Sequence, residues 1–204
     1  MAKRSRQWIR RHETDPFVRQ ARRSEYRSRA VFKLTEIDRH DRLLRAGMTV
    51  IDLGAAPGGW SQYVARRVGD QGRVIAVDAL PMSPIKHVEF IQGDVSEPET
   101  IARCLDLLHG APADLVISDL APNLTGIRAT DQARSLQLGH SVCAFADAVL
   151  RPGGDLLIKV FQGQGMDEFR KELVKRFQRV INRKPRASRD SSREFYVLAR
   201  GYKV

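Results

Sequence analysis

Residues 49–60 read TVIDLGAAPGGW, a short apolar run followed by a glycine-rich turn. The run predicts a buried strand over 49–53, and the residues after the turn predict a helix over about 60–68. Glycines at such a turn let the backbone approach a ligand closely, and the first N–H groups of the next helix face that ligand. Gly54 and Gly58 are four apart with a proline before the second, and no Gly-Lys-Ser/Thr follows. The turn is therefore neither a GxGxxG fingerprint nor a P-loop.

Strands and helices alternate on both sides of this stretch. Predicted strands cover 49–53, 73–77, 88–92, 114–118, 155–161 and 195–199, and predicted helices cover 28–46, 60–68, 98–108, 131–150 and 167–177. A turn over 151–154 separates the fourth of these helices from the strand that follows it. Apolar strands separated by helices are typical of a parallel sheet with helices on both faces. Residues 1–27 are polar and rich in arginine, and they predict an arm that is ordered only in part.

Two aspartates end predicted strands after the glycine turn. Asp78 follows the second strand, where a carboxylate binds ribose hydroxyls in doubly wound folds. Asp94 follows the third strand, where it could accept a hydrogen bond from an adenine amino group. Each aspartate alone is more often a cap or turn residue. Together with the glycine turn, they favour an adenosine-type cofactor.

Four charged residues lie within apolar stretches or at the ends of predicted strands, and each could have either a functional or an ordinary structural role. Lys159 interrupts the apolar strand LLIKVF, where an unpaired ammonium would be costly unless it reaches solvent at the strand end. Asp119 ends the neighbouring strand, and Lys33 lies on the apolar stripe of its helix, where a snorkelling lysine is the ordinary explanation. Glu194 begins the last strand. If that strand is antiparallel, Glu194 meets Asp119 and Lys159; otherwise it is a surface glutamate among arginines.

The charge is concentrated at the two ends of the chain. Residues 1–29 carry a net charge of +7 and residues 170–204 a net charge of +9, whereas the residues between them carry −5. Of the 35 basic residues 27 are arginine, which suits bidentate contacts with phosphate. The pattern favours a nucleic-acid partner over a merely solubilising surface. On this hypothesis Arg22, Arg23 and Arg27 at one end, and Arg183, Lys184 and Arg186 at the other, contact phosphates.

Composition excludes several other classes of protein. Hydrophobic content of 42% and charged content of 29% fit a globular protein rather than a disordered one. No run of about 18 apolar residues exists, and the first residues lack the apolar stretch of a signal peptide, so we expect no membrane association. Cys104 and Cys143 have no CxxC or His-rich context, which predicts reduced core thiols, no metal site and a cytoplasmic location.

The motifs together resemble the FtsJ/RrmJ family of S-adenosylmethionine-dependent ribose 2′-O-methyltransferases over nearly the whole chain. The resemblance is carried by SRAVFKLTEI (28–37), DLGAAPGGWSQY (52–63), SDLAPNLTG (118–126), LLIKVFQGQG (156–165) and KPRASRDSSREFY (184–196), in the family order. It implies a Rossmann-like fold with a mostly parallel seven-stranded sheet, an antiparallel last strand and helices on both faces. The domain would cover 28–204 behind the basic arm at 1–27.

The resemblance also implies roles for individual residues. Lys33, Asp119, Lys159 and Glu194 would form a catalytic Lys-Asp-Lys-Glu tetrad, with Lys159 either the base that takes the ribose proton or a charged group that only positions the oxygen. Contacts with S-adenosyl-L-methionine would come from Gly58, Trp60, Asp78, Asp94 and Asp119. A lysine acts as a base only in its neutral form, and four coupled groups titrate as a set.

The implied substrate is a uridine in the A-loop of large-subunit (23S) ribosomal RNA, within the large ribosomal subunit. The protein is expected to act as a monomer. Two alternatives stay open at this point. One is a 2′-O-methyltransferase of transfer RNA or another RNA with the same tetrad. The other is a non-catalytic RNA-binding ribosome assembly factor that keeps the cofactor pocket.

Overall fold

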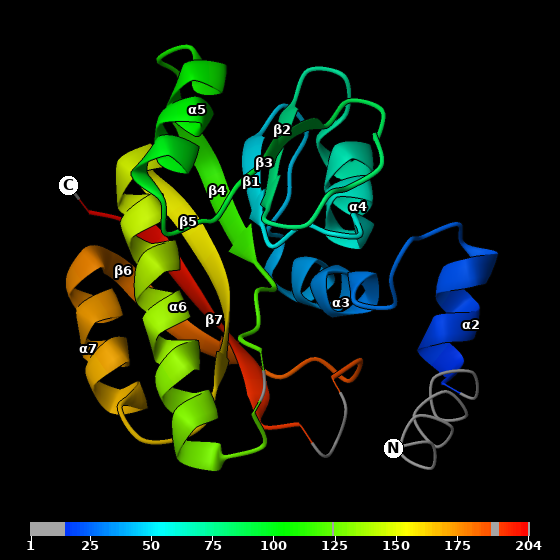
Figure 1. The fold of residues 1–204 in the computed structure, drawn as a ribbon. Coiled ribbons are helices and arrows are strands. Elements are labelled where there is room, and N and C mark those ends of the chain that lie inside the picture. The colour runs from blue at the N-terminus through cyan, green and yellow to red at the C-terminus, as the bar shows by residue number, and fades with distance from the viewer. Residues whose placement is uncertain (1–14, 124, 189–191, 204) are drawn as a thin grey trace.

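The computed structural model describes residues 15–123, 125–188 and 192–203, and its sheet follows the predicted α/β pattern (Figure 1). The strands are β1 (Thr49–Leu53), β2 (Arg73–Asp78), β3 (Glu89–Gln92), β4 (Ala113–Ser118), β5 (Leu150–Phe161), β6 (Phe177–Arg183) and β7 (Glu194–Tyr202). The helices are α2 (Pro16–Arg23), α3 (Val31–Asp41), α4 (Gly59–Val68), α5 (Pro98–Leu108), α6 (Arg128–Val149) and α7 (Met166–Arg176).

The seven strands form one sheet in the order β3-β2-β1-β4-β5-β7-β6. Strands β1 to β5 are parallel, and β7 runs antiparallel to both β5 and β6, which confirms the predicted fold. The chain moves outward from β1 in one direction through β3 and then restarts beside β1 with β4. This reversal is the switch point at which open α/β sheets bind ligands, at the carboxyl ends of the strands.

Two apolar layers hold the helices against the sheet. Helices α5, α6 and α7 cover one face, with the largest buried side chains from Phe145, Phe169 and Phe177. Helices α3 and α4 cover the other face, where Leu34 and Trp60 are buried with the inward residues of the strands. Because both faces of the central strands are buried, these strands read as continuous apolar runs in the sequence.

Three segments differ from the sequence prediction. The residue pattern does not predict strand β6, because its residues, FQRVINR, form a half-exposed strand at the edge of the sheet. Helix α2 lies inside the predicted arm: Asp15 caps it by accepting from Phe17 N, Pro16 is at its first turn, and Val18 is buried. Residues 1–14 of that arm lie outside the described residues. The predicted turn at 151–154 falls within the span of β5, where the pairing with β4 shifts register.

The two basic ends of the chain meet around α3. Arg29 pairs with Asp15 and also donates to the carbonyl oxygen of Ala187. Arg183 pairs with Asp41 at the end of α3, with Nη2 2.6 Å from Oδ1. Segments about 150 positions apart in sequence therefore share one side of the molecule. Within the described ranges, no helix has the length and apolar character needed to cross a membrane.

Candidate active site

The glycine turn between β1 and α4 has a backbone that only glycine adopts easily. Gly54 has a φ of +81° and Gly58 a φ of +108°, and a Cβ added to Gly54 would lie 2.5 Å from Cγ of Leu120. The turn is fastened to the neighbouring strand, because Gly54 N donates to the carbonyl oxygen of Val77 at 2.8 Å. The close approach of Leu120 brings the segment after β4 directly against the turn, as expected at the switch point.

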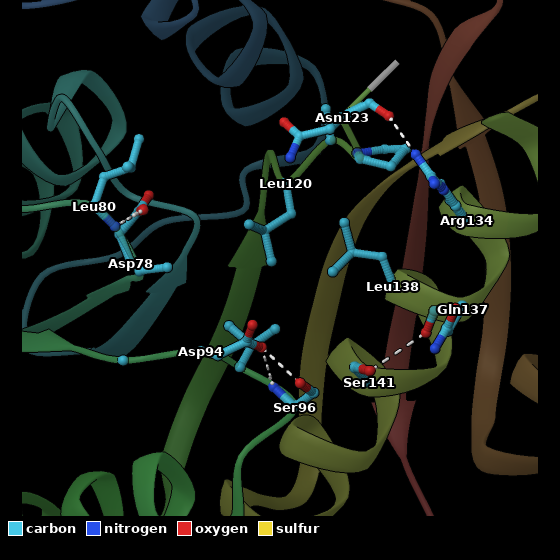
Figure 2. Close-up of a pocket in the computed structure, with 15 residues that line it drawn as sticks. Asp78, Leu80, Asp94, Ser96, Leu120, Asn123, Arg134, Gln137, Leu138 and Ser141 are labelled. Atoms are coloured by element: carbon cyan, nitrogen blue, oxygen red, sulfur yellow. Dashed lines mark hydrogen bonds between the residues drawn. The ribbon is translucent and has the colours of Figure 1, made fainter. Parts of the chain in front are cut away.

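A pocket of about 660 Å³ opens at the carboxyl ends of β2, β3 and β4 (Figure 2). Asp78 and Asp94 both line it, as the sequence predicted for an adenosine-type cofactor. Asp78 is nearly buried and accepts backbone N–H groups from Ala56 at 2.9 Å and Leu80 at 2.8 Å. Each carboxylate oxygen can accept a second bond, so ribose hydroxyls could still bind there. The rest of the lining is mixed: Leu120 and Leu138 are among the apolar residues that would fit the base, and Asn123, Arg134 and Gln137 are among the polar ones.

Asp94 is the more exposed of the two carboxylates. One of its oxygens, Oδ1, accepts from Ser96 N at 2.8 Å and from the Ser96 hydroxyl at 2.6 Å. These bonds stabilise the charged form and hold the pKa of Asp94 below its usual value. Asp94 is therefore an ionised acceptor, a form suited to an amino group or hydroxyl of a ligand.

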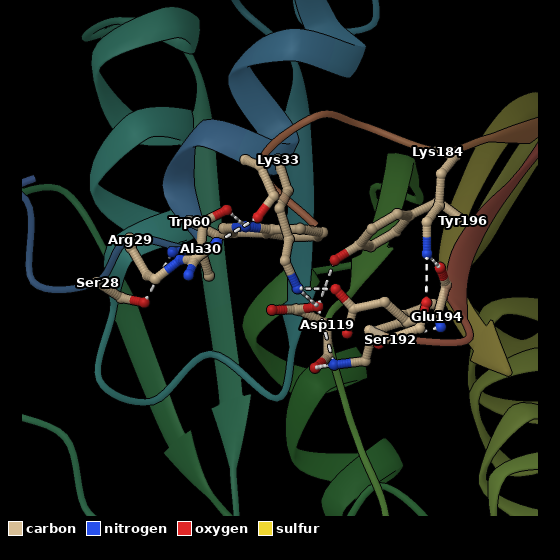
Figure 3. Close-up of polar contacts among 12 residues, drawn as sticks. Ser28, Arg29, Ala30, Lys33, Trp60, Asp119, Lys184, Ser192, Glu194 and Tyr196 are labelled. Carbon is tan, nitrogen blue, oxygen red and sulfur yellow. Dashed lines mark hydrogen bonds and ion pairs between the residues drawn. The ribbon is translucent and has the colours of Figure 1, made fainter. Parts of the chain in front are cut away.

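Four charged residues that are far apart in sequence converge near the carboxyl ends of β4 and β5. Figure 3 shows three of them, Lys33, Asp119 and Glu194, pointing toward one another. Lys159 Nζ lies 3.0 Å from Oδ1 of Asp119 and donates to the backbone oxygen of Asp119 at 2.6 Å. Lys33 Nζ lies 2.7 Å from Oε1 of Glu194 and 3.8 Å from Oδ1 of Asp119. The side chains are between 7% and 17% exposed, so two positive and two negative charges neutralise one another in a largely desolvated cluster.

The antiparallel direction of β7 is what brings Glu194 into this cluster. Glu194 pairs with Phe161 at the carboxyl end of β5, and Tyr196 pairs with Lys159. Lys33 reaches the cluster from α3, whose predicted apolar stripe is confirmed by the burial of Val31, Leu34 and Ile37. The lysine on that stripe thus faces the sheet rather than solvent.

Tyr196 is a fifth member of the cluster that the sequence analysis missed. Its hydroxyl donates to Oδ1 of Asp119 at 2.6 Å, and its ring lies 5.7 Å from Lys33 Nζ. Burial, with the adjacent Asp119 charge, raises the pKa of Tyr196 well above its usual value, so the hydroxyl stays protonated and donates. The sequence does hold a signal for Tyr196. It lies two residues after Glu194, and alternate residues of a strand share a face, so a strand that places Glu194 in the cluster also points Tyr196 toward it.

The charges of the cluster also act on Glu194. Burial alone would raise the pKa of this carboxyl, but the adjacent ammonium group of Lys33, aided by Lys159, outweighs burial and holds the pKa below its usual value. Glu194 is therefore ionised over the neutral range and remains paired with Lys33.

Trp60 lies in the core between α3 and β7. Its side chain is 3% exposed, its ring packs against Tyr196, and its Nε1 donates to the backbone oxygen of Ala30 at 2.8 Å. The indole therefore links the helix that carries Lys33 to the strand that carries Glu194. Any contact of Trp60 with a cofactor would have to come from its backbone at the start of α4.

A buried acid lies beneath the glycine turn. Asp52 is 1% exposed; Oδ2 accepts from the Ser61 hydroxyl at 2.6 Å, whereas Oδ1 has no partner among the described residues. Burial, together with the charges of Asp119 and Asp78, raises the pKa of Asp52 to about 7. Asp52 lies in β1, between β2, which ends in Asp78, and β4, which Asp119 follows. The sequence analysis missed it, although a charged residue inside an apolar strand is the signal that singled out Lys159.

Half of the basic side chains expected to contact phosphate are engaged within the protein. Arg27 donates to the carbonyl oxygens of Pro57 at 3.2 Å, Ser83 at 2.6 Å and Pro84 at 2.7 Å. Arg183 is paired with Asp41, and Lys184 Nζ donates to the backbone oxygens of Ser192 and Glu194. Arg22, Arg23 and Arg186 form no side-chain ion pair with any described carboxylate. The hypothesis of phosphate contacts therefore depends on Arg22, Arg23 and Arg186.

The sheet order, the antiparallel β7 and the carboxylates after β2 and β3 define a Rossmann-like methyltransferase. The model of the FtsJ-like methyltransferase family matches residues 26–202, and the chain belongs to this family. This confirms the family expected from the motifs, and with it an S-adenosylmethionine-dependent methyltransferase.

Curated relatives and a solved structure agree with this assignment. The chain is 54% identical to "Ribosomal RNA large subunit methyltransferase E" of Alkalilimnicola ehrlichii, over 97% of this chain and 95% of the relative. It is also 54% identical to the protein of the same name from Pseudomonas aeruginosa, over 99% of this chain and 98% of that relative. A crystal structure of a ribosomal RNA methyltransferase from Plasmodium falciparum is 27% identical, with a TM-score of 0.80 over 87% of this chain and 98% of that one.

Proposed function

We propose that this protein methylates a ribose 2′-hydroxyl of large-subunit ribosomal RNA, with S-adenosyl-L-methionine as the methyl donor. The proposal names a uridine of the A-loop as the acceptor and the large ribosomal subunit as its setting. The protein would act as a cytoplasmic monomer. The observation that carries the proposal is the convergence of Lys33, Asp119, Lys159 and Glu194 beside the pocket that contains Asp78 and Asp94.

The pocket residues fit the cofactor. Asp78 would accept from the ribose hydroxyls and Asp94 from the adenine amino group, while Gly58 and the start of α4 would face the charged amino-acid end. Asp119 follows β4 next to Leu120, so it would border both the cofactor and the acceptor. When bound, S-adenosyl-L-methionine supplies a methyl group that is electrophilic because it is attached to a sulfonium.

The tetrad would prepare the acceptor oxygen. Lys159 is the least exposed of the four side chains, and Asp119 fixes its Nζ from two directions. We assign to Lys159 the removal of the 2′-hydroxyl proton, which would leave the ribose oxygen able to accept the methyl group as the bond from that methyl to sulfur breaks. This role requires the neutral amine, so Lys159, which is the positive partner of Asp119 in the cluster, would first have to release its own proton. Lys33 holds Glu194, and Tyr196 holds Asp119, so the geometry around the acceptor is fixed before the RNA binds.

The RNA would approach over the side of the molecule where the two basic ends meet. Of the six basic residues expected to contact phosphate, Arg27, Arg183 and Lys184 are engaged within the protein. Phosphate contacts from the other three, Arg22, Arg23 and Arg186, would supply sequence-independent affinity. Specificity would then come from RNA shape and from an unstacked target nucleotide, as is usual for RNA recognition.

The decisive experiment is transfer of labelled methyl groups to four substrates: naked 23S RNA, the isolated large subunit, whole ribosomes and transfer RNA, with the modified nucleotide mapped. We expect a single 2′-O-methyluridine in the A-loop. Modification of transfer RNA instead would overturn the substrate, and tight cofactor binding without transfer to any RNA would favour the assembly factor.

A further inference from the structure

A second pocket lies beside the tetrad, between the start of α6 and the loop that joins β5 to α7. Its volume is about 390 Å³, and no described carboxylate lines it. One wall is a stripe of α6 made by Ala129, Ala133 and Leu136 at helical spacing, and the other is the backbone of residues 163–165. A Cβ on Gly165 would lie 2.6 Å from the Leu136 side chain, so glycine lets the loop lie against the helix. The result is a narrow, largely apolar slot.

Two arginines border this slot. Arg128 comes from the first turn of α6 and Arg193 from the residue before β7, and both are exposed. Neither guanidinium forms an ion pair with a carboxylate in the described part of the chain. This contrasts with Arg183, which is neutralised by Asp41. An apolar slot between two unpaired guanidinium groups is complementary to a nucleotide, with its flat base and its anionic phosphate.

Gln132 adds an unsatisfied polar atom to the wall of the slot. Its Nε2 donates to the backbone oxygens of Phe161 at 3.1 Å and Gln164 at 3.2 Å, which fixes the orientation of the amide. Its Oε1 then remains buried without a partner, in a residue that is 5% exposed. This unpaired acceptor lies directly beneath the glycine loop that forms the other wall, since a Cβ added to Gly163 would lie 2.6 Å from it.

The slot is close to the reacting groups. Gln162 N donates to the backbone oxygen of Arg193 at 3.0 Å, and Glu194 of the tetrad is the next residue. Arg193 also lines a neighbouring pocket of about 350 Å³ that contains Glu194 itself. The start of α6, the β5–α7 loop and the start of β7 gather at one end of the molecule (Figure 1). Arg193 therefore separates the acceptor site from the slot.

We propose that this slot binds an unstacked nucleotide that flanks the acceptor in the RNA. Its base would lie against Ala133 and the glycine loop, and Arg128 and Arg193 would contact the phosphates on either side. This inference rests on the proposed function, which identifies the RNA as large-subunit ribosomal RNA. It adds a second recognition point, so that the enzyme reads a nucleotide next to the one it modifies.

Two variants test the slot independently. Arg128→Gln with Arg193→Gln removes both charges, and Ala133→Phe fills the slot without a change of charge. Arg179→Gln is the matched control, because this exposed arginine pairs with Arg200 in the register of β6 and β7, away from the Glu194 end. Each variant is titrated with a large-subunit ribosomal RNA transcript and with assembled large subunits at several salt concentrations, and cofactor affinity is measured in parallel.

We expect the double arginine variant to bind RNA at least tenfold more weakly, with a slope of log affinity against log salt that is smaller by about 1.4–1.8. Ala133→Phe should weaken binding with the slope unchanged, and Arg179→Gln should match the wild type. Wild-type affinity in both slot variants would overturn the inference, as would a loss seen only on assembled subunits, which would indicate a ribosomal protein in the slot. Because the readout is binding, a failure of the proposed methylation would be seen separately.

Discussion

The two sides of the sheet edge, which the proposed function assigns to the cofactor and to the methyl acceptor, hold their carboxylates in different ways. On the cofactor side, which comprises the ends of β1, β2 and β3, Asp78 and Asp94 accept hydrogen bonds from nearby backbone or serine groups. On the acceptor side, which comprises the end of β4, β5 and the start of β7, Asp119 is held by Lys159 and Tyr196 from distant parts of the chain. The partners on the cofactor side lie no more than 22 positions along the chain from their carboxylate, whereas Lys159 and Tyr196 lie 40 and 77 positions from Asp119.

This difference has an energetic meaning. A carboxylate that accepts backbone N–H groups can be replaced with the loss of one or two hydrogen bonds. A residue of the tetrad cannot be replaced alone without leaving a partly buried charge uncompensated. We therefore expect substitutions on the acceptor side to affect turnover, and substitutions on the cofactor side to affect cofactor affinity.

The largest effect is expected for Lys159→Ala. Turnover should fall by about 10²–10⁴-fold, because the group that takes the proton from the acceptor oxygen is lost. Calorimetry should show nearly unchanged affinity for S-adenosyl-L-methionine. Lys159→Arg separates the two roles considered for this residue: an arginine could still position the oxygen but could not act as a base. Turnover within a few-fold of wild type in Lys159→Ala would sink the assignment.

The next effect concerns stability and Asp52. The pKa of this carboxyl is about 7 in the folded protein and 3.8 in its ordinary state. Between these values the folded state binds the proton more tightly, so this group's contribution to stability declines as pH rises from 4 to 7. Asp52→Asn cannot ionise, so its stability relative to the wild type should increase by on the order of 2–4 kcal/mol over this range.

Urea unfolding of both proteins at pH 4.5, 6 and 8 measures this difference. Asp94→Asn is the matched control, because Asp94 is exposed and its pKa is lowered rather than raised. A stability difference between Asp52→Asn and the wild type that does not vary with pH would show that Asp52 is not a buried titrating group.

A smaller effect is expected for Asp78→Ala. The KM for S-adenosyl-L-methionine should rise by about 10–100-fold, the usual loss for hydrogen bonds to a charged group, while kcat changes by less. Asp78→Asn keeps one acceptor oxygen, so its KM for S-adenosyl-L-methionine should lie between those of the wild type and Asp78→Ala. If Asp78→Ala lowers kcat while the KM for the cofactor is unchanged, the division between the two sides is wrong.

The smallest effect separates arginines within the basic arm. Arg22→Gln with Arg23→Gln should lower the salt slope of RNA binding by about 1.4–1.8 and leave cofactor affinity unchanged. Arg27→Gln should do the reverse, because Arg27 binds the carbonyl oxygens of Pro57, Ser83 and Pro84 beside the glycine turn. Filter binding of RNA and calorimetry of the cofactor measure the two quantities. Equal salt slopes for all three proteins would mean that Arg22 and Arg23 do not contact RNA phosphates.

The sequence predicted the central strands well, because strands buried on both faces leave apolar runs that need no knowledge of their neighbours. It also singled out Lys159, since a lysine in such a run is unusual unless it has a partner. The edge strand β6 was missed because its half-exposed residues resemble a surface segment. The expectation of a seventh strand came from the resemblance to a family, because the residue pattern alone predicts six.

Other features depend on orientation, which composition does not carry. Arg27 belongs to an arginine-rich stretch, yet its guanidinium binds protein carbonyl oxygens rather than facing solvent. Tyr196 is an ordinary buried aromatic of a strand until Asp119 is placed beside its hydroxyl. Gln132 becomes informative only when its amide is seen to bond two carbonyl oxygens and leave Oε1 unpaired. Each of these required the relative placement of segments that are distant in sequence.

The position of β7 has a consequence for how the protein is made. This strand lies between β5 and β6 in the sheet, although it follows both in the chain. A nascent chain that has been translated as far as β5 already contains Asp78, Asp94 and the glycine turn, but it lacks Glu194 and Tyr196, and one edge of β5 is unpaired. If the roles proposed for these residues hold, translation delivers the groups for binding the donor before those for using it. The growing polypeptide would then have no complete tetrad until its β6–β7 hairpin leaves the ribosome.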